Sequence, residues 1–429
     1  MVKTSILGYM PIMLLAYIWL VAGLADPTGV FSNFTYLRWL SYPIIFSLGL
    51  ITIFFVISRG KILKLGFAIY FLIILLIWIA SYLLHNFPIK DIIYAFGVYL
   101  RYPLFFAILI YLKTTKQQYE LFFQFITYLA LLLLIEAIVN YLFLGRSGDS
   151  TFFTLGVAWG HVSAGIIFLY TSCLVIAHAL VKRMSLWHVL FILLIGIASL
   201  IASVRTTIIW LPILMVLLLL VNKKLIRPMW VGFFSLIFIA ATLLLSFIIP
   251  VWWPAIVASF PALEVINPTY RLSYISRVLT ELVDINDIFF GSGPRSMNPG
   301  HIDNMGYMFD YFYHHADLKH IIDNGTNQFV KAFAEIGAIG FVVYWLMLLR
   351  VLLINLQLWK RLQGVSSVDL SGIKILNLAF FGIWLHFSAL GLISNDIWRF
   401  DASGLIFWVS ASYIVFATKK LKGNNLEFR

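Results

Sequence analysis

Long apolar runs, separated by short polar segments, cover most of the chain. Each run has roughly the 20 residues that a helix needs to cross a bilayer. Because lipid cannot satisfy backbone hydrogen bonds, each run is predicted to be helical, and their continuous rather than alternating pattern excludes a transmembrane barrel. The predicted spans are 5–24, 39–58, 63–84, 92–112, 121–144, 155–181, 187–203, 205–221, 229–250, 327–351, 372–393 and 403–418. The expected fold class is therefore all-α integral membrane, with about twelve helices.

Two places in these runs are unusual: the end of the first run and the junction between the seventh and eighth. Gly23, Leu24 and Ala25 resemble the cleavage site of a signal peptide. However, the run before them is long for a signal and no soluble domain follows, so 5–24 is predicted to be the first span. At Ala202–Val204, two runs meet almost without a loop, which predicts a tight helical hairpin.

Composition agrees with a membrane protein. The mean hydropathy is +0.97 and only 11% of residues are charged, too few to form the polar shell of a soluble protein of 429 residues. The net charge of +12 does not indicate a nucleic-acid partner, because the basic residues lie in short connections. Cys173 lies within an apolar run and predicts neither a disulfide nor a metal site.

Alternate connections carry the Lys-rich segments, which the positive-inside rule places in the cytoplasm. Both termini are then cytoplasmic and the number of spans is even. These basic residues are Arg59, Lys61, Lys64, Lys113, Lys116, Lys182, Arg183, Lys223, Lys224, Arg227, Lys360, Arg361, Lys419, Lys420 and Lys422.

The opposite side is richer in arginine than in lysine. The planar guanidinium suits bidentate binding of phosphate, which indicates a phosphate-bearing ligand on this side. Carboxylate pairing or snorkelling at helix ends is the alternative explanation. The basic residues on this side are Arg38, Arg101, Arg146, Arg205, Arg271, Arg277, Arg295, Arg399, Lys90, Lys319 and Lys331.

One long outer loop, between the ninth and tenth spans, divides the chain into 1–250, 251–326 and 327–429. We expect it to open with an interfacial aromatic group at Val251–Pro254 and to carry function, as long loops often do.

Within the loop, a helix is predicted to start at Asn267–Pro268. Its Arg271 lies roughly 60° from the centre of the apolar stripe and Arg277 roughly opposite, which favours Arg271 for contact with a lipid-linked phosphate. The helix should stop at Gly291–Pro294, just before Arg295; these glycines allow either an anion-binding turn or an ordinary helix end.

The segment from His301 to His320 mixes acids, histidines and aromatic rings. Its spacing does not match zinc ligation, so no metal is predicted. The aromatic residues suit either stacking on sugar rings or packing within the loop. The acids and histidines are Asp303, Asp310, His314, His315 and Asp317, and the aromatic residues are Tyr307, Phe309, Tyr311, Phe312 and Tyr313.

The loop ends at Asp323–Asn327, whose residues favour the start of the tenth span. Glu335 is predicted about two turns inside that span. A carboxylate within a membrane span is a functional candidate, with pairing to a nearby Arg as the alternative. Gly337 and Gly340 are expected to allow close helix packing.

This arrangement resembles the superfamily of O-antigen polymerases (Wzy-type) and O-antigen ligases. The resemblance covers the span pattern of nearly the whole chain and three local patterns. These are Ser203-Val204-Arg205-Thr206 at a helix edge; Arg271 followed by Gly291-Ser292-Gly293; and Asn327-Gln328-Phe329 followed by Glu335-Ile336-Gly337 and Gly340. The ligases carry a His where this chain has Thr326, which favours a polymerase.

The resemblance implies a bacterial inner-membrane glycosyltransferase of the GT-C type, acting at the periplasmic face. A glycan would pass from undecaprenyl pyrophosphate to a sugar hydroxyl of another lipid-linked repeat unit, without a cofactor or metal. Fixed cations would stabilise the leaving pyrophosphate. Arg205 and Arg271 are expected in that role, with Arg295, Arg399 and Arg277 in support. His320, Asp323 and Glu335 are candidates to orient or deprotonate the acceptor, and Thr326, Asn327, His314 and His315 to bind substrate.

Two other functions fit twelve helices: a ligase that transfers glycan to a lipid A core, and a flippase for the same lipid-linked sugar. A flippase is expected to show two similar halves and a charged central cavity. No repeat relates 1–220 to 221–429, and Glu136 is the clearest charge within a span. The expected partners are the bilayer and the lipid-linked oligosaccharide, with a chain-length regulator and a flippase as candidate protein partners.

Overall fold

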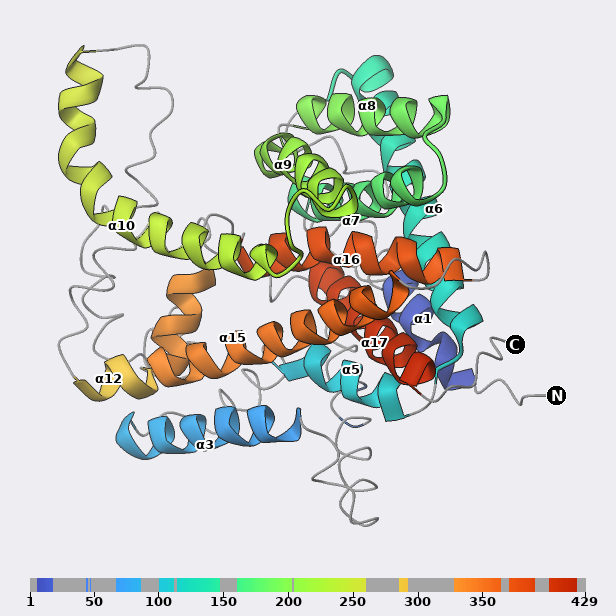
Figure 1. Ribbon diagram of the computed structural model, residues 1–429. Coiled ribbons are helices and arrows are strands. Elements are labelled where there is room, and N and C mark those ends of the chain that lie inside the picture. Colours follow the sequence, from blue (N-terminus) through green and yellow to red (C-terminus); the bar gives the residue numbers. More distant parts are fainter. Residues whose placement is uncertain are drawn as a thin grey trace, which may run out of the picture.

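Helices form all the regular structure in the part of the chain that the computed structural model describes, which confirms the all-α class (Figure 1). The described residues are 6–17, 44, 47, 67–85, 100–111, 114–146, 160–202, 204–259, 285–291, 328–363, 370–389 and 401–422. Their elements are η1 (Ile6–Tyr9), α1 (Met10–Ala16), α3 (Ala68–His85), α5 (Arg101–Tyr111), α6 (Lys116–Leu144), α7 (Gly160–Val181), α8 (Leu186–Ile201), α9 (Arg205–Asn222), α10 (Trp230–Ser259), α12 (Ile285–Phe290), α15 (Gln328–Leu362), α16 (Ser371–Ala389) and α17 (Asp401–Lys422).

Four of these helices are long and apolar enough to cross a membrane: Lys116–Leu144, Ser163–Val181, Glu335–Leu362 and Ser371–Ala389. Large apolar side chains also face outward, among them Phe143 at 78% and Trp187 at 79% exposure. Such surfaces are stable in lipid and not in water. The protein is therefore a helical membrane protein. The span predicted at 39–58 lies outside the described residues, apart from two isolated positions.

The centre of the bundle is α16, which packs against α7, α9, α10, α15 and α17. Nearly every side chain of this helix is buried. Small residues bring the backbones close together: a Cβ added at Gly382 would lie 2.8 Å from Cys173 Sγ, and one at Gly165 would lie 2.8 Å from Thr207 Oγ1. Within a membrane, such small residues permit the tight helix packing that dispersion forces require.

Polar groups inside the bundle bond across helix interfaces. Asn377 on α16 donates from Nδ2 to Asn355 Oδ1 of α15 at 2.6 Å, while Asn355 Nδ2 donates to the Asn377 carbonyl at 3.2 Å. Ser235 of α10 and Ser388 of α16 are joined at 2.9 Å between their hydroxyls. Because an unpaired polar group at this depth is costly, these bonds fix how the helices face one another.

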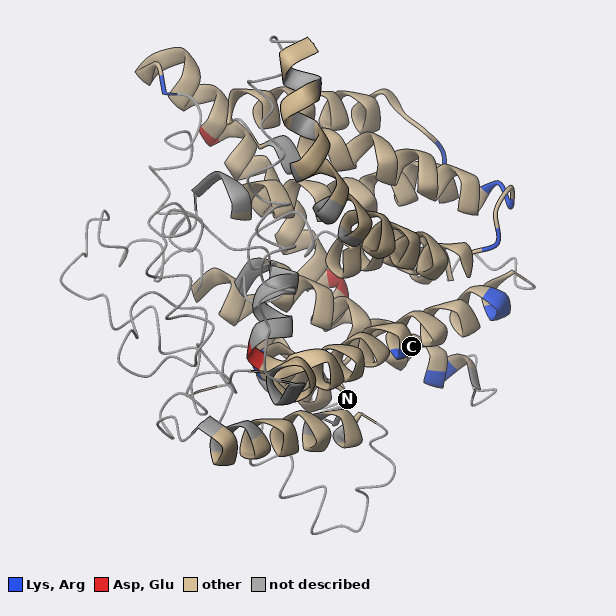
Figure 2. Cartoon of the chain, turned by 90° about the vertical axis from the view of Figure 1, so that its left-hand side faces the viewer, with Lys and Arg blue, Asp and Glu red and all other residues tan. Residues whose placement is uncertain are grey.

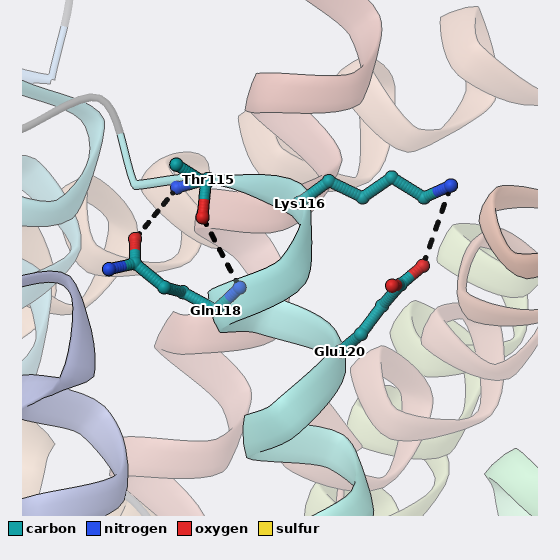
Figure 3. Close-up of polar contacts among 4 residues, drawn as sticks. All are labelled: Thr115, Lys116, Gln118 and Glu120. Atoms are coloured by element: carbon teal, nitrogen blue, oxygen red, sulfur yellow. Dashed lines mark hydrogen bonds and ion pairs between the residues drawn. The ribbon is translucent and has the colours of Figure 1, made fainter. Parts of the chain in front are cut away.

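Two predicted helix boundaries shift. The span predicted to begin at residue 121 begins at Lys116, because a capping box fixes its first turn (Figure 3). Gln118 N donates to Thr115 Oγ1 at 3.3 Å, and Thr115 N donates to Gln118 Oε1 at 2.9 Å. Lys116 Nζ also lies 3.6 Å from Glu120 Oε1.

The other shift concerns the end of the ninth predicted helix. The residues Val251–Pro254, expected to open the loop, lie within α10, which continues to Ser259. Pro250 and Pro254 each remove one helical hydrogen bond, but membrane helices tolerate proline, which bends them. Figure 1 shows α10 changing direction along its length, as these prolines predict.

The predicted hairpin is confirmed, because only residues 202–204 separate α8 from α9, and Val204 N donates to Ser199 O at 2.8 Å. The basic residues also group in space. Figure 2 shows the described Lys and Arg gathered mostly at one end of the bundle. Arg361 Nη1, near the end of α15, donates to Thr418 O near the end of α17 at 2.9 Å. The connection after α15 and the C-terminal tail, both predicted to be cytoplasmic, therefore begin at the same end.

The Asn355–Asn377 pair should contribute measurably to stability. We expect a double-mutant cycle with Asn355→Ala and Asn377→Ala to give a coupling energy of about 0.6–1.7 kcal/mol, the range found for hydrogen bonds between membrane helices. Unfolding of the purified protein in detergent would measure it. The matched control pairs Asn355→Ala with Asn222→Ala, because Asn222 bonds elsewhere, to Leu180 O; additive effects are expected there. Additive effects in the Asn355–Asn377 cycle would contradict the prediction.

Candidate active site at the break in α15

The helix α15 is interrupted near its beginning. It has 35 residues, and Gly337 within it has the non-helical angles φ 64° and ψ −178°. A first segment therefore runs from Gln328 to the break, and a second continues to Leu362. Figure 1 shows the two segments at different angles. Interrupted helices at membrane depth occur where the freed backbone groups face protein or a cavity, and they often form ligand sites.

The short helix α12, from within the long loop, covers this break. It lies against α15 and α3 and is followed by Gly291, whose φ is 78°. A Cβ added at Gly291 would lie 2.6 Å from the Glu335 carbonyl carbon and from Gly337 N, and a Cβ at Gly337 would collide with the carbonyl oxygen of Phe289. Both positions thus need glycine, for its backbone conformation and for lack of space.

This contact shows where two of the predicted glycines lie. Gly291 ends α12, as expected of a helix stop. Gly337 allows close packing, but against the end of α12 and through a broken helix rather than along a continuous one. For Gly340, the nearest atoms to an added Cβ belong to Ile336 of the same helix.

Glu335 lies two residues before the break and is only 1% exposed. Its main chain is the part of α15 that Gly291 touches. Burying a carboxylate costs several kcal/mol unless polar groups or charges surround it, so proteins keep one at such a depth mainly for a function. Glu335 is therefore a buried acid whose main chain lies against a segment of the long loop.

Glu335 and the basic end of the bundle lie at opposite ends of α15. Lys360 and Arg361 occupy the last turn of α15. At a rise of about 1.5 Å per residue they are roughly 35 Å from Gly337, more than the thickness of a hydrocarbon core. Arg350, between the two ends, lies 5.0 Å over the Phe67 ring at the start of α3. If the basic end is cytoplasmic, Glu335 lies near the outer face.

Few of the other predicted site residues fall in the described part of the chain. Arg205 is the first residue of α9, and its side chain is not described. Outside the described residues lie Arg271, Arg277, Arg295, Arg399, His314, His315, His320, Asp323, Thr326 and Asn327. The structure therefore brings together the Gly291 and Glu335–Gly337 segments, and leaves the convergence of the arginines as a prediction.

The structure also draws attention to Arg101, which sequence reasoning counted on the outer side but not among the site residues. It is 2% exposed, and its guanidinium carbon lies 4.4 Å from the centre of the Tyr102 ring. That ring packs on Gly404 of α17, where an added Cβ would lie 3.0 Å from Tyr102 Cε2. The sequence contained a usable indication: an ionisable residue inside an apolar run, the same pattern that singled out Glu335.

Metal ligation finds no support among the described residues, where no three His, Cys, Asp or Glu side chains come together. The mixed segment from His301 to His320 lies outside them. Cys173 is buried and free.

Comparison with known proteins adds no relative: no model of a protein family matches the chain, and no curated protein matches it.

The backbone contact at the break can be tested by adding single methyl groups. We expect Gly337→Ala and Gly291→Ala each to destabilise the protein by about 1–3 kcal/mol or more, because each forces a non-glycine residue into a strained conformation against another backbone. Thermal unfolding in detergent would measure the loss. Gly196→Ala is the matched control, since nothing lies within 4 Å of an added Cβ there and alanine favours the helix α8. Unchanged stability of both variants would contradict the described contact.

Proposed function

We propose that this protein is an O-antigen (surface polysaccharide) polymerase of the Wzy type. It spans the bacterial inner membrane about twelve times, with both termini in the cytoplasm and the 251–326 loop in the periplasm. It transfers a growing glycan from undecaprenyl pyrophosphate to a sugar hydroxyl on another lipid-linked repeat unit. The glycosidic bond to the acceptor forms as the bond to the pyrophosphate breaks, and the acceptor proton is released.

One observation carries the proposal beyond the sequence resemblance. Two of the three local patterns behind the resemblance, Gly291-Ser292-Gly293 and Glu335-Ile336-Gly337, are far apart in the chain, yet their backbones touch at Gly291 and Gly337. A site built from a loop and a span requires such a meeting point. The main chain of Glu335, a buried acid, lies against Gly291 of the loop whose sequence carries Arg271 and Arg295, which supports the proposal.

The roles follow from the charges that the reaction creates. Pyrophosphate leaves with concentrated negative charge, which fixed guanidinium groups stabilise without a metal. Arg205 and Arg271 supply that charge in the proposal, and Arg295 or Arg399 assists. The acceptor hydroxyl needs orientation and a proton acceptor. Glu335 is the described candidate for this role, and His320 and Asp323 are the alternatives.

A flippase for the same lipid-linked sugar is the second candidate. The break in α15 favours it, since interrupted helices are frequent in transporters. An O-antigen ligase is the third, because it shares the resemblance and differs in its acceptor. These functions predict different accumulating products, so one experiment separates them.

The decisive variants are Arg205→Ala, Arg271→Ala and Glu335→Gln in cells that lack the natural gene. We expect each to lose the ladder of long polysaccharide on a gel and to leave single repeat units on the cell surface. Loss of Arg should reduce activity by about 10²–10³-fold, as for other residues that stabilise a developing anion. Glu120→Gln is the matched control, because Glu120 is a partly exposed acid at the opposite end.

Other outcomes would identify the alternatives. Carrier-linked repeats trapped inside the cell would indicate a flippase, and long chains that never reach lipid A would indicate a ligase. Unchanged long chains in all three variants would remove these residues from the mechanism.

The proposed orientation has its own test, which the single buried Cys173 makes simple. We expect Lys319→Cys to react with a membrane-impermeant maleimide in intact cells with a permeable outer membrane. Lys223→Cys should react only after the inner membrane is opened, since it lies at the basic end. The wild-type chain, with its thiol buried, is the background control. The reverse labelling would place the loop in the cytoplasm and overturn the proposal.

A further inference from the structure

A groove of about 730 Å³ lies at the basic end of the bundle, far from Glu335. The connection between α9 and α10 forms one wall, and the last turns of α15 form the other. Its inner surface is apolar, with Leu353, Leu356 and Trp359 from α15 facing Val221 and Met229. The C-terminal end of α15 therefore borders a groove whose walls are apolar, as the interior of a bilayer is.

The groove is also cationic. Lys224, Arg227 and Lys360 line it, and none of the residues lining it is acidic. Within the described part of the chain, these three side chains make no hydrogen bond or ion pair. The neighbouring Arg361 differs, because its guanidinium bonds to Thr418 O of α17. Three cations with apolar walls beside them match a ligand with an anionic head and a hydrocarbon tail.

The backbone at Lys224 turns at the end of α9, at the wall of the groove. Lys224 has φ 59°, a left-handed conformation that favours glycine or asparagine. This conformation ends α9, where Leu225 N donates to Leu220 O at 2.9 Å, and it turns the chain into the connection that forms the wall of the groove. The exposed apolar side chains Met229, at 64%, and Leu353, at 48%, show that the groove is continuous with the lipid-facing surface.

We propose that this groove binds an anionic phospholipid of the surrounding bilayer. The phosphate of the headgroup lies among Lys224, Arg227 and Lys360, and an acyl chain lies along Leu353, Leu356 and Met229. A soluble phosphate compound fits less well, because the apolar walls would gain nothing from it. Basic pockets between membrane helices hold acidic lipids by this combination of charge and burial. The inference is independent of the glycosyltransferase proposal.

The test uses the full-length protein in nanodiscs, with phosphatidylglycerol compared with phosphatidylcholine as the probe. We expect the wild type to retain phosphatidylglycerol in native mass spectrometry and to unfold at a higher temperature with it. The triple variant Lys224→Gln, Arg227→Gln, Lys360→Gln should bind it about 100-fold more weakly, since each cation near an anionic lipid is worth about fivefold. A matched triple variant, Lys182→Gln, Arg183→Gln, Lys223→Gln, removes three exposed cations of the same end outside the groove and should retain binding.

Two further measurements separate weaker binding from misfolding, and a lipid from a soluble phosphate compound. Lys360→Glu alone, a change on an exposed helix face, should also weaken binding if the triple variant fails to fold. Soluble glycerol phosphate should not compete, because it lacks the chain. Equal loss in both triple variants would show a general charge effect and overturn the proposal. Equal binding by glycerol phosphate would assign the groove to a free phosphate compound and overturn it as well.

Discussion

The inability of lipid to bond with the backbone is the constraint on which this structure depends. In such a solvent every peptide group must find a partner within the protein. Long helices satisfy the constraint along most of the chain, and any interruption must be covered. The break at Gly337 meets this requirement through α12, whose end lies directly on it. The functional candidate Glu335 therefore lies beside the one place in α15 where the helix is interrupted.

The same constraint explains the interior of the bundle. Apolar surface gives little preference for one helix arrangement over another in lipid, so glycines and polar pairs determine the contacts. Gly382 and Gly165 let α16 and α9 approach α7, and the Asn355–Asn377 pair joins α15 to α16. Since α15 also carries the break, the orientation of Glu335 depends on bonds made far along the same helix.

Local patterns predicted much of this. The all-α class, the hairpin at Ala202–Val204 and the helix end at Gly291 all follow from residues close in sequence. The start of α6 could also have been predicted, because the capping pair Thr115 and Gln118 is visible in the sequence. The meeting of Gly291 with Gly337 could not, since it depends on how a loop folds back onto a distant span. The burial of Arg101 likewise results from tertiary packing, with α17 against α5. For Arg205 and Arg271, the sequence supplies the chemistry while their convergence remains a prediction.

The joint between α12 and α15 is made from main chain, with no side chain between the two glycines. The side chains on either side of this joint therefore do not hold the two segments together. Because backbone atoms alone set the distance between the two segments, the joint keeps its geometry when neighbouring side chains change.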